Sequence, residues 1–192
     1  MLGNNSIGSA PSLLDSGEVA SKVSTAGLDR RINSQSLVDI MYDGFYLVFL
    51  LRNHYFSNEP RHFRQKIYDF LDKFEMNARK KGFLSEDIHE AKYAYCALID
   101  ETIMTSQESD FQTLKDAWEL NPLQLDLFGS QIAGNEFFER LDGLREQGEQ
   151  RLAALEVYHY AMLLGFQGKY RLEAPEKIRY LISRLRSEEH TS

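Results

Sequence analysis

The stretch that decides the fold is Tyr93-Ala94-Tyr95-Cys96-Ala97-Leu98-Ile99-Asp100-Glu101-Thr102-Ile103-Met104. It contains neither glycine nor proline and is rich in alanine and other apolar residues, so it predicts a helix. Two adjacent acids, Asp100 and Glu101, interrupt the apolar pattern. At helical spacing Asp100 shares an apolar face with Cys96 and Met104. A bare carboxylate there costs several kcal/mol. Asp100 is therefore expected either to have internal partners or to face a site where something binds.

Two adjacent side chains on a helix point about 100° apart. Asp100 and Glu101 therefore cannot flank one reacting atom, which argues against a hydrolase with paired carboxylates. Two interpretations remain open for Asp100: an internal salt bridge or hydrogen bond, with Arg171 or a tyrosine as partner, or an acidic feature in a groove that accepts a partner. Glu101 lies off the centre of the apolar face, so we expect it to be the freer acid and the better candidate for a partner contact.

The rest of the chain shows helical patterns and no strand alternation of useful length. A first helix is predicted from a Ser34 or Ser36 cap to Arg52, a second from Pro60 to Gly82, and a third from a Ser85 cap. Later helices are predicted over Asn135–Gln147, over Glu149–Phe166 and from Pro175 onwards. Between the two sets we expect a short helix carrying Trp118 and a short helix or turn over Leu123–Phe128. The core is expected to include the aromatic residues Trp118, Phe137, Phe138 and Phe166.

Composition excludes several classes of function. The chain has 29 acidic and 22 basic residues and a formal net charge of −7, which disfavours sequence-independent nucleic-acid binding. Its single cysteine, Cys96, excludes an internal disulfide. No secretory signal is visible, and the longest clean apolar run, Phe45 to Leu51, is too short to span a membrane. Residues 1–33 are rich in serine, glycine and asparagine and predict a flexible tail, and residues 188–192 form a polar end.

No motif for a metal or a cofactor emerges. The five histidines, at positions 54, 62, 89, 159 and 190, form no His-Glu-x-x-His pair, so we expect neither a metal site nor a catalytic site. The glycines of Gly165-Phe166-Gln167-Gly168 follow a long helix, whereas a phosphate-binding loop precedes one. They predict a helix terminator with Phe166 tucked back and Lys169-Tyr170-Arg171 leaving the turn.

Four ordered phrases carry a family resemblance. Tyr95-Cys96-Ala97-Leu98-Ile99-Asp100-Glu101 resembles the signature of TssL, the DotU/IcmH-like family of inner-membrane proteins of type VI secretion systems. Leu163–Arg171, with Gly165, Phe166, Gly168, Tyr170 and Arg171, is similar to a structural turn of that family. Phe137-Phe138-x-x-Leu141 and Leu155–Tyr158 fall between them in the family's order. The match covers Ser36 to Arg186, but Phe128-Gly129-Ser130 and Ala133-Gly134 depart from the family's pattern.

The resemblance implies an all-α domain over residues 34–187: two three-helix bundles packed as a hook, with the acid pair at the cleft between them. It implies a non-enzymatic structural component that links the inner-membrane complex to the cytoplasmic baseplate. The implied partners are TssM, TssK and TssE, with self-association left open. The implied membrane anchor is a C-terminal helix absent from this chain, which would then be the cytoplasmic part. The alternatives are a DotU/IcmH component of a type IVB system and a helical enzyme using Asp100 or Glu101 as general base.

Overall fold

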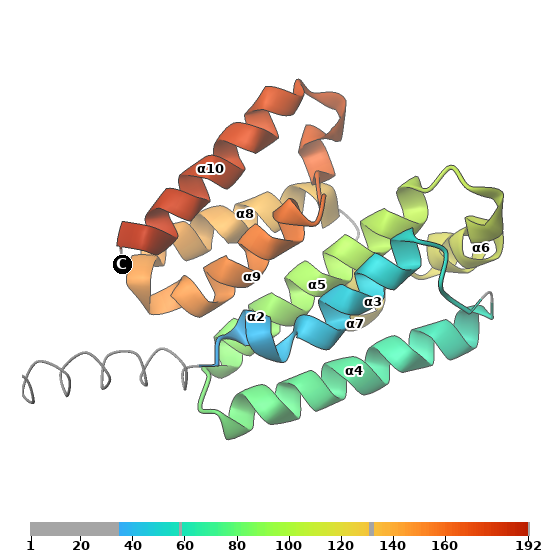
Figure 1. The fold of residues 1–192 in the computed structure, drawn as a ribbon, viewed down its shortest axis with the longest axis horizontal. Helices are drawn as coiled ribbons and strands as arrows, with labels where there is room; N and C mark the ends of the chain where they lie inside the picture. The colour runs from blue at the N-terminus through green and yellow to red at the C-terminus, as the bar shows by residue number, and fades with distance from the viewer. Residues whose placement is uncertain (1–34, 58, 131–132, 192) are drawn as a thin grey trace, which may run out of the picture. The chain divides into compact units, whose positions relative to one another are not determined.

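A computed structural model describes residues 35–57, 59–130 and 133–191. The chain divides into a unit Met1–Gln35 and a compact unit Ser36–Ser192. The flexible tail predicted over residues 1–33 lies outside the described residues. Every regular element of the described part is helical (Figure 1), which confirms the all-α prediction.

The helices follow the predicted order. The first set comprises α2 (Leu37–Ile40), α3 (Tyr42–Arg52), α4 (Pro60–Lys80) and α5 (Ser85–Thr105). The connecting segment contains the 3₁₀ turn η1 (Ser109–Phe111) and the short helices α6 (Gln112–Leu120) and α7 (Leu123–Phe128). The last set comprises α8 (Ala133–Gln147), η2 (Gly148–Arg151), α9 (Leu152–Leu163), η3 (Gly168–Leu172) and α10 (Pro175–Thr191). Among the described helices, none combines the length and apolar character needed to cross a membrane.

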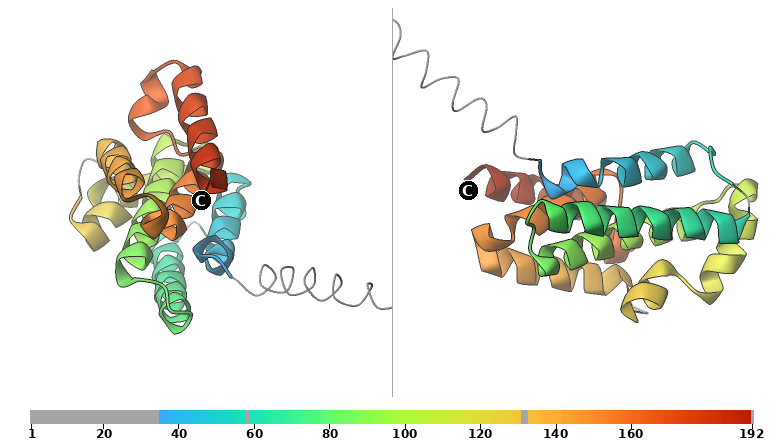
Figure 2. Two further views of the ribbon diagram at one scale, coloured as in Figure 1. Left: turned by 90° about the vertical axis from the view of Figure 1, so that its left-hand side faces the viewer. Right: turned by 90° about the horizontal axis from the view of Figure 1, so that it is seen from below.

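Helix α5 is the centre of the compact unit. Every residue from Tyr93 to Asp100 is buried, because α5 is surrounded by α3, α4, α6, α7, α8 and α9. Figure 2 shows this helix running among the others within the unit. A helix that is apolar around its whole circumference requires such a position. The unbroken apolar run of the sequence is therefore the signature of a central helix.

In the last set, α9 contacts α8 and α10, and it also contacts α5 of the first set. The predicted face of α8 is buried as expected, and its Phe137 ring lies 4.1 Å from that of Phe166 and 4.6 Å from that of Tyr158. Phe138 and Trp118 are also buried, so the predicted aromatic core is confirmed. The two sets of helices meet where α9 packs against α5 and α2 and where α8 packs against α5.

Several helix starts differ from the prediction, and α9 begins only at Leu152, after the 3₁₀ turn η2. The first helix is not continuous, since α2 ends at Ile40, Met41 (φ −84°, ψ −1°) lies between the two helices, and α3 begins at Tyr42. Ser36 does cap α2, in a capping box with Asp39. Ser85 is not a cap: Leu84 precedes α5 without a side-chain bond, and the Ser85 hydroxyl accepts a hydrogen bond from Arg79 at 3.1 Å.

Candidate functional site

Asp100 is buried in α5 and accepts three hydrogen bonds. Its Oδ1 accepts from the indole Nε1 of Trp118 and from the backbone N–H of Leu123, both at 2.9 Å. Its Oδ2 accepts from the backbone N–H of Gln124 at 2.9 Å. Leu123 and Gln124 begin α7, and the residue before them, Pro122, makes no side-chain cap. Asp100 thus supplies, from another helix, the acceptor that the free N–H groups of α7 need.

Burial and hydrogen bonding act in opposite directions on the Asp100 carboxyl. Burial raises its pKa, while the three donors and the nearby Arg64 guanidinium favour the charged form and lower it. The net result is a pKa raised to about 6. Arg64 stacks 4.3 Å above the Trp118 ring and donates to the Asn121 carbonyl at 2.6 Å. The carboxylate therefore holds α6 and the start of α7 against α5.

Glu101, the next residue, holds a different segment. Its carboxylate accepts the backbone N–H of Gln167 at 2.8 Å and that of Gly168 at 2.7 Å. Arg171 adds a charged hydrogen bond at 3.2 Å. Only 12% of the Glu101 side chain is exposed. The expectation that Glu101 would be the freer acid is wrong, because both acids are held within the domain.

The segment held by Glu101 is the glycine turn that follows α9. The Phe166 N–H donates to the Ala161 carbonyl and the Gly165 N–H to the Met162 carbonyl, both of which belong to the last turns of α9. Gly165 has φ of +99°, so this is a Schellman termination that favours glycine. Phe166 is buried, as predicted. The structure therefore bears out a helix terminator here.

Gly168 brings the turn into contact with the start of α8. Its φ is +49°, and a Cβ at this position would lie 2.7 Å from the Gly134 carbonyl oxygen. Two backbones can approach this closely only where a side chain is missing. Beyond the glycine, the Tyr170 ring packs at 4.7 Å against Phe138 of α8. Gly168 and Tyr170 thus fix the turn to α8, while Glu101 fixes it to α5.

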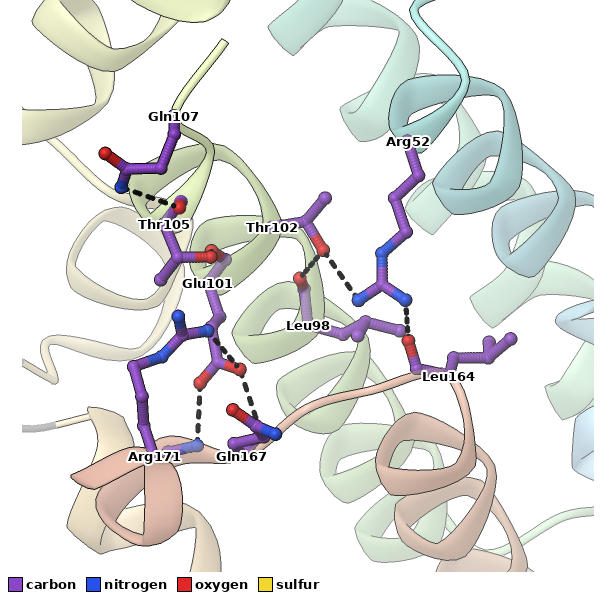
Figure 3. Close-up of polar contacts among 10 residues, drawn as sticks. Arg52, Leu98, Glu101, Thr102, Thr105, Gln107, Leu164, Gln167 and Arg171 are labelled. Carbon is purple, nitrogen blue, oxygen red and sulfur yellow. Dashed lines mark hydrogen bonds and ion pairs between the residues drawn. The ribbon is translucent and has the colours of Figure 1, made fainter. Parts of the chain in front are cut away.

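Arg52 completes the arrangement from the end of α3. Its guanidinium donates to the Leu164 carbonyl and, at 3.4 Å, to the Thr102 hydroxyl (Figure 3). Thr102 in turn donates to the Leu98 carbonyl at 2.7 Å. Burial lowers the pKa of Arg52, while the nearby Glu101 carboxylate raises it. The sequence showed Arg52 only as the cation that closes an apolar run, so its bond to the glycine turn could not be predicted.

A cavity of about 300 Å³ lies between the two segments that the acids hold. Pro122 and Gln124 line it from the start of α7, and Phe166 and Gly168 line it from the glycine turn. Its other lining residues are Ala97, Asp100, Glu101, Met104, Thr105, Ser130 and Gly134. Gln124 gives no signal in the sequence pattern, and no prediction named it. The acid pair therefore does line a cavity, and its role in partner binding stays a prediction.

The predicted partners of Asp100 are corrected by these contacts. Arg171 pairs with Glu101 instead, and the aromatic donor to Asp100 is Trp118 rather than a tyrosine. Among the described residues, no group of three or more histidine, cysteine or acidic side chains is placed to hold a metal ion. What the site offers chemically is a largely apolar hollow whose wall carries two carboxylates that each accept three hydrogen bonds from the chain itself.

Comparisons with known proteins agree with this fold. The cytoplasmic domain of TssL from Acinetobacter baumannii is 53% identical over 82% of this chain and 99% of its own, with a TM-score of 0.79. SciP/TssL from enteroaggregative Escherichia coli 042 is 24% identical over 79% and 86%, with a TM-score of 0.66. TssL from Vibrio cholerae is 22% identical over 81% and 95%, with a TM-score of 0.68. The last two likenesses show the fold alone.

A search among curated proteins found no match. The family model described as "Type VI secretion system protein DotU" matches residues 36–191, which is nearly the whole described part of the chain. The resemblance carried by the acid pair and the glycine turn is thereby confirmed. The chain belongs to the DotU family of type VI secretion system proteins and is a TssL/DotU-like protein.

Proposed function

We propose that this chain is a non-enzymatic structural component of the type VI secretion membrane complex, acting at the cytoplasmic face of the inner membrane. Membership of the DotU family and the 53% identity to a TssL cytoplasmic domain support this assignment. The description of the family model favours a type VI system over the type IVB alternative. In this role the domain links the inner-membrane complex to the baseplate, with TssM, TssK and TssE as partners.

The chemistry of the acid pair supports a scaffold over an enzyme. A general base must reach a proton on a bound substrate. Asp100 and Glu101 each accept three hydrogen bonds from their own chain, two of them from backbone N–H groups. Carboxylates held in this way organise the backbone around them. Their role in partner binding is then to hold the backbone around the cavity in a fixed conformation.

One observation carries the proposal. Adjacent acids on α5 hold two segments that are distant in sequence, the start of α7 and the glycine turn after α9, on either side of one cavity. A surface fixed in this way loses little conformational freedom when a partner binds. We propose that the partner docks over this cavity, with Asp100 and Glu101 shaping its wall.

The proposal is tested by measuring the affinity of the purified chain for TssK, TssE and the cytoplasmic part of TssM. Thr105→Tyr places a large side chain at the cavity wall and is expected to weaken binding of a baseplate partner at least about tenfold. Thr113→Tyr makes the same change at an exposed position of α6 and serves as the matched control. Equal affinity of both variants and the wild type would remove the cavity from the interface. If the wild-type chain bound none of the three proteins, the proposed link would be overturned.

A further inference from the structure

Large apolar side chains are exposed together on α3 and α9. Tyr42, Tyr46 and Phe49 follow one another along α3 at spacings of four and three residues, so they share one face of the helix. They are 68%, 52% and 56% exposed, and the rings of Tyr46 and Phe49 stack with their centroids 6.0 Å apart. On α9, Tyr160 and Leu163 are 45% and 56% exposed. These five residues are called the aromatic patch below.

The two parts of the aromatic patch are joined by Phe45 of α3. Its ring stacks on that of Tyr160 at 5.7 Å, and it lies one helical turn from Phe49. Since aromatic side chains carry about 150–250 Å² each, the patch offers roughly 500 Å² of mostly apolar surface. Exposed patches of this size mark interaction sites on soluble proteins. Figure 2 shows α3 and α7 on opposite sides of α5, so the patch is separate from the cavity that α7 lines.

At Tyr160 the aromatic patch continues into a hollow of about 230 Å³ between α2 and α9. Asp39 and Glu156 line this hollow with the tyrosine, and Ser36 and Val38 complete it. One oxygen of Asp39 accepts the backbone N–H of Ser36 at 2.8 Å, so its other oxygen has room for a further donor. The hollow therefore combines carboxylates with an aromatic ring, which are the groups that attract a cation.

The charges around the aromatic patch decide what can cover it. Besides Asp39 and Glu156, the exposed Asp43 lies one turn before Tyr46. Arg52, further along α3, is directed to the Leu164 carbonyl. A second copy that docked through the same face would set like charges against each other, and anionic lipid headgroups or nucleic-acid phosphates would be repelled. A basic and apolar partner surface is attracted by the carboxylates and also covers the rings.

We infer that the aromatic patch is a second docking surface of the domain, and that it receives a basic apolar segment of a partner protein, with one lysine or arginine side chain in the hollow beside Tyr160. The inference goes beyond the proposed docking at the cavity. It gives the domain two separate surfaces, which a component that links two assemblies requires.

Three small probes that share one ring and differ in charge test the chemistry of the surface: phenethylammonium, 2-phenylethanol and phenylacetate. Each is titrated into the ¹⁵N-labelled chain at low salt. Phenethylammonium is expected to shift the backbone amides of Asp39 and Tyr160 and to bind at least about tenfold more tightly than phenylacetate. This preference should shrink at high salt, because the carboxylates are partly exposed. Equal affinities of the three probes would overturn the inference.

Asp39→Asn tests where the cation lies. The amide oxygen still accepts the Ser36 N–H, so the variant changes the charge and keeps the helix cap. It is expected to weaken phenethylammonium about threefold to fivefold and to leave 2-phenylethanol unchanged. Asp116→Asn, at an exposed position of α6, is the matched control and should change neither. If Asp39→Asn bound both probes as the wild type does, the hollow would not be the cation site and the inference would be wrong.

Tyr46→Lys tests the surface against TssM, TssK and TssE. It removes one ring and adds a cation, and it is expected to weaken one of these proteins at least about tenfold. Met76→Lys is the control, because Met76 of α4 is 63% exposed and lies outside the patch. Asp43→Lys keeps every ring and should weaken the same protein. If both patch variants bound all three proteins as the wild type does, the patch would not be an interface of this complex. If Tyr46→Lys instead converted a dimer of the chain into monomers, a second copy would cover the patch and the basic partner would be wrong.

The inference and the proposed function fail separately. If the probes show no preference for the cation while the wild-type chain binds its partners, the inference is wrong and the proposed function stands. If the wild-type chain binds none of the three proteins, the proposed link is wrong, and the probes still decide whether the aromatic patch takes a basic apolar group.

Discussion

The indole Nε1 of Trp118 donates a 2.9 Å hydrogen bond to the carboxylate of Asp100, and both side chains are buried. This contact joins α6 to the central helix by a polar bond inside an apolar core. The same carboxylate accepts the first two N–H groups of α7. One side chain therefore determines where two short helices lie.

Replacing Asp100 by alanine is expected to lower the free energy of unfolding by about 3 kcal/mol or more. Three buried donors lose their acceptor at once, and each unpaired group costs about 1–3 kcal/mol. Urea denaturation of the purified chain measures the change. Asp116→Ala, at an exposed position of α6, is the control and is expected to change stability by less than about 0.5 kcal/mol. A loss for Asp100→Ala as small as that of the control would show that the three bonds contribute little.

Asp100 should make the folded protein less stable as the pH rises, which is opposite to the effect of a carboxyl whose pKa is lowered by folding. Burial raises its pKa to about 6, above the value of about 3.9 in an unfolded chain. Between these values the folded protein keeps a proton that the unfolded chain has released. The contribution of Asp100 to stability is thus fully present below pH 4 and is lost as the pH rises through 6, by about 3 kcal/mol in total.

The measurement compares wild type with Asp100→Asn, which cannot titrate, by urea denaturation between pH 4 and pH 7. Carboxyls with lowered pKa, such as Glu75 and Glu136, act in the opposite direction but are common to both proteins, so they cancel. The stability of wild type relative to Asp100→Asn is expected to fall across this range. A constant difference, together with a ¹³C carboxyl titration of Asp100 centred near pH 4, would contradict the prediction.

How far the sequence could predict this site is clear from Asp100 itself. Helical spacing placed it on an apolar face and therefore required partners for it. Its actual partners lie 18 to 24 residues further along the chain and depend on the turn between α6 and α7. Periodicity says nothing about such a turn, so the sequence offers Arg171 or a tyrosine as a partner of Asp100, whereas Arg171 pairs with Glu101. The apolar run of α5, by contrast, is a local property, and it predicted the central helix correctly.

Glu101 shows a second limit of prediction from the sequence. Its place off the apolar face suggested an exposed side chain, yet the glycine turn folds over it and covers it. A pattern within one helix cannot report what a later segment of chain will cover. Gln124 is a similar case, because a glutamine between two leucines gives no sign that its amide will be buried without a partner.

Glu101→Gln is expected to lower the free energy of unfolding by about 1–2 kcal/mol, since a neutral amide accepts more weakly from the two N–H groups and from Arg171. Glu101→Lys should cost more, because three donors would then face a cation. Amide hydrogen exchange locates the effect: the N–H groups of Gln167 and Gly168 should exchange faster in Glu101→Gln. Arg171→Ala removes only a partly exposed partner and should cost less than about 1 kcal/mol. Unchanged exchange at both amides would contradict the anchoring role of Glu101.

A matched pair of glycines tests the contact between the glycine turn and α8. Gly168→Ala forces a Cβ into a residue with φ of +49°, 2.7 Å from the Gly134 carbonyl oxygen, and should lower the free energy of unfolding by about 1–3 kcal/mol. Gly143→Ala, inside α8, meets no atom within 4 Å and should raise it by about 0.5–1 kcal/mol through helix propensity. Thermal and urea denaturation of both variants give the two signs. If Gly168→Ala were as stable as Gly143→Ala, the turn would have room to move away from α8, and the cavity beside it would not be the fixed surface that partner binding requires.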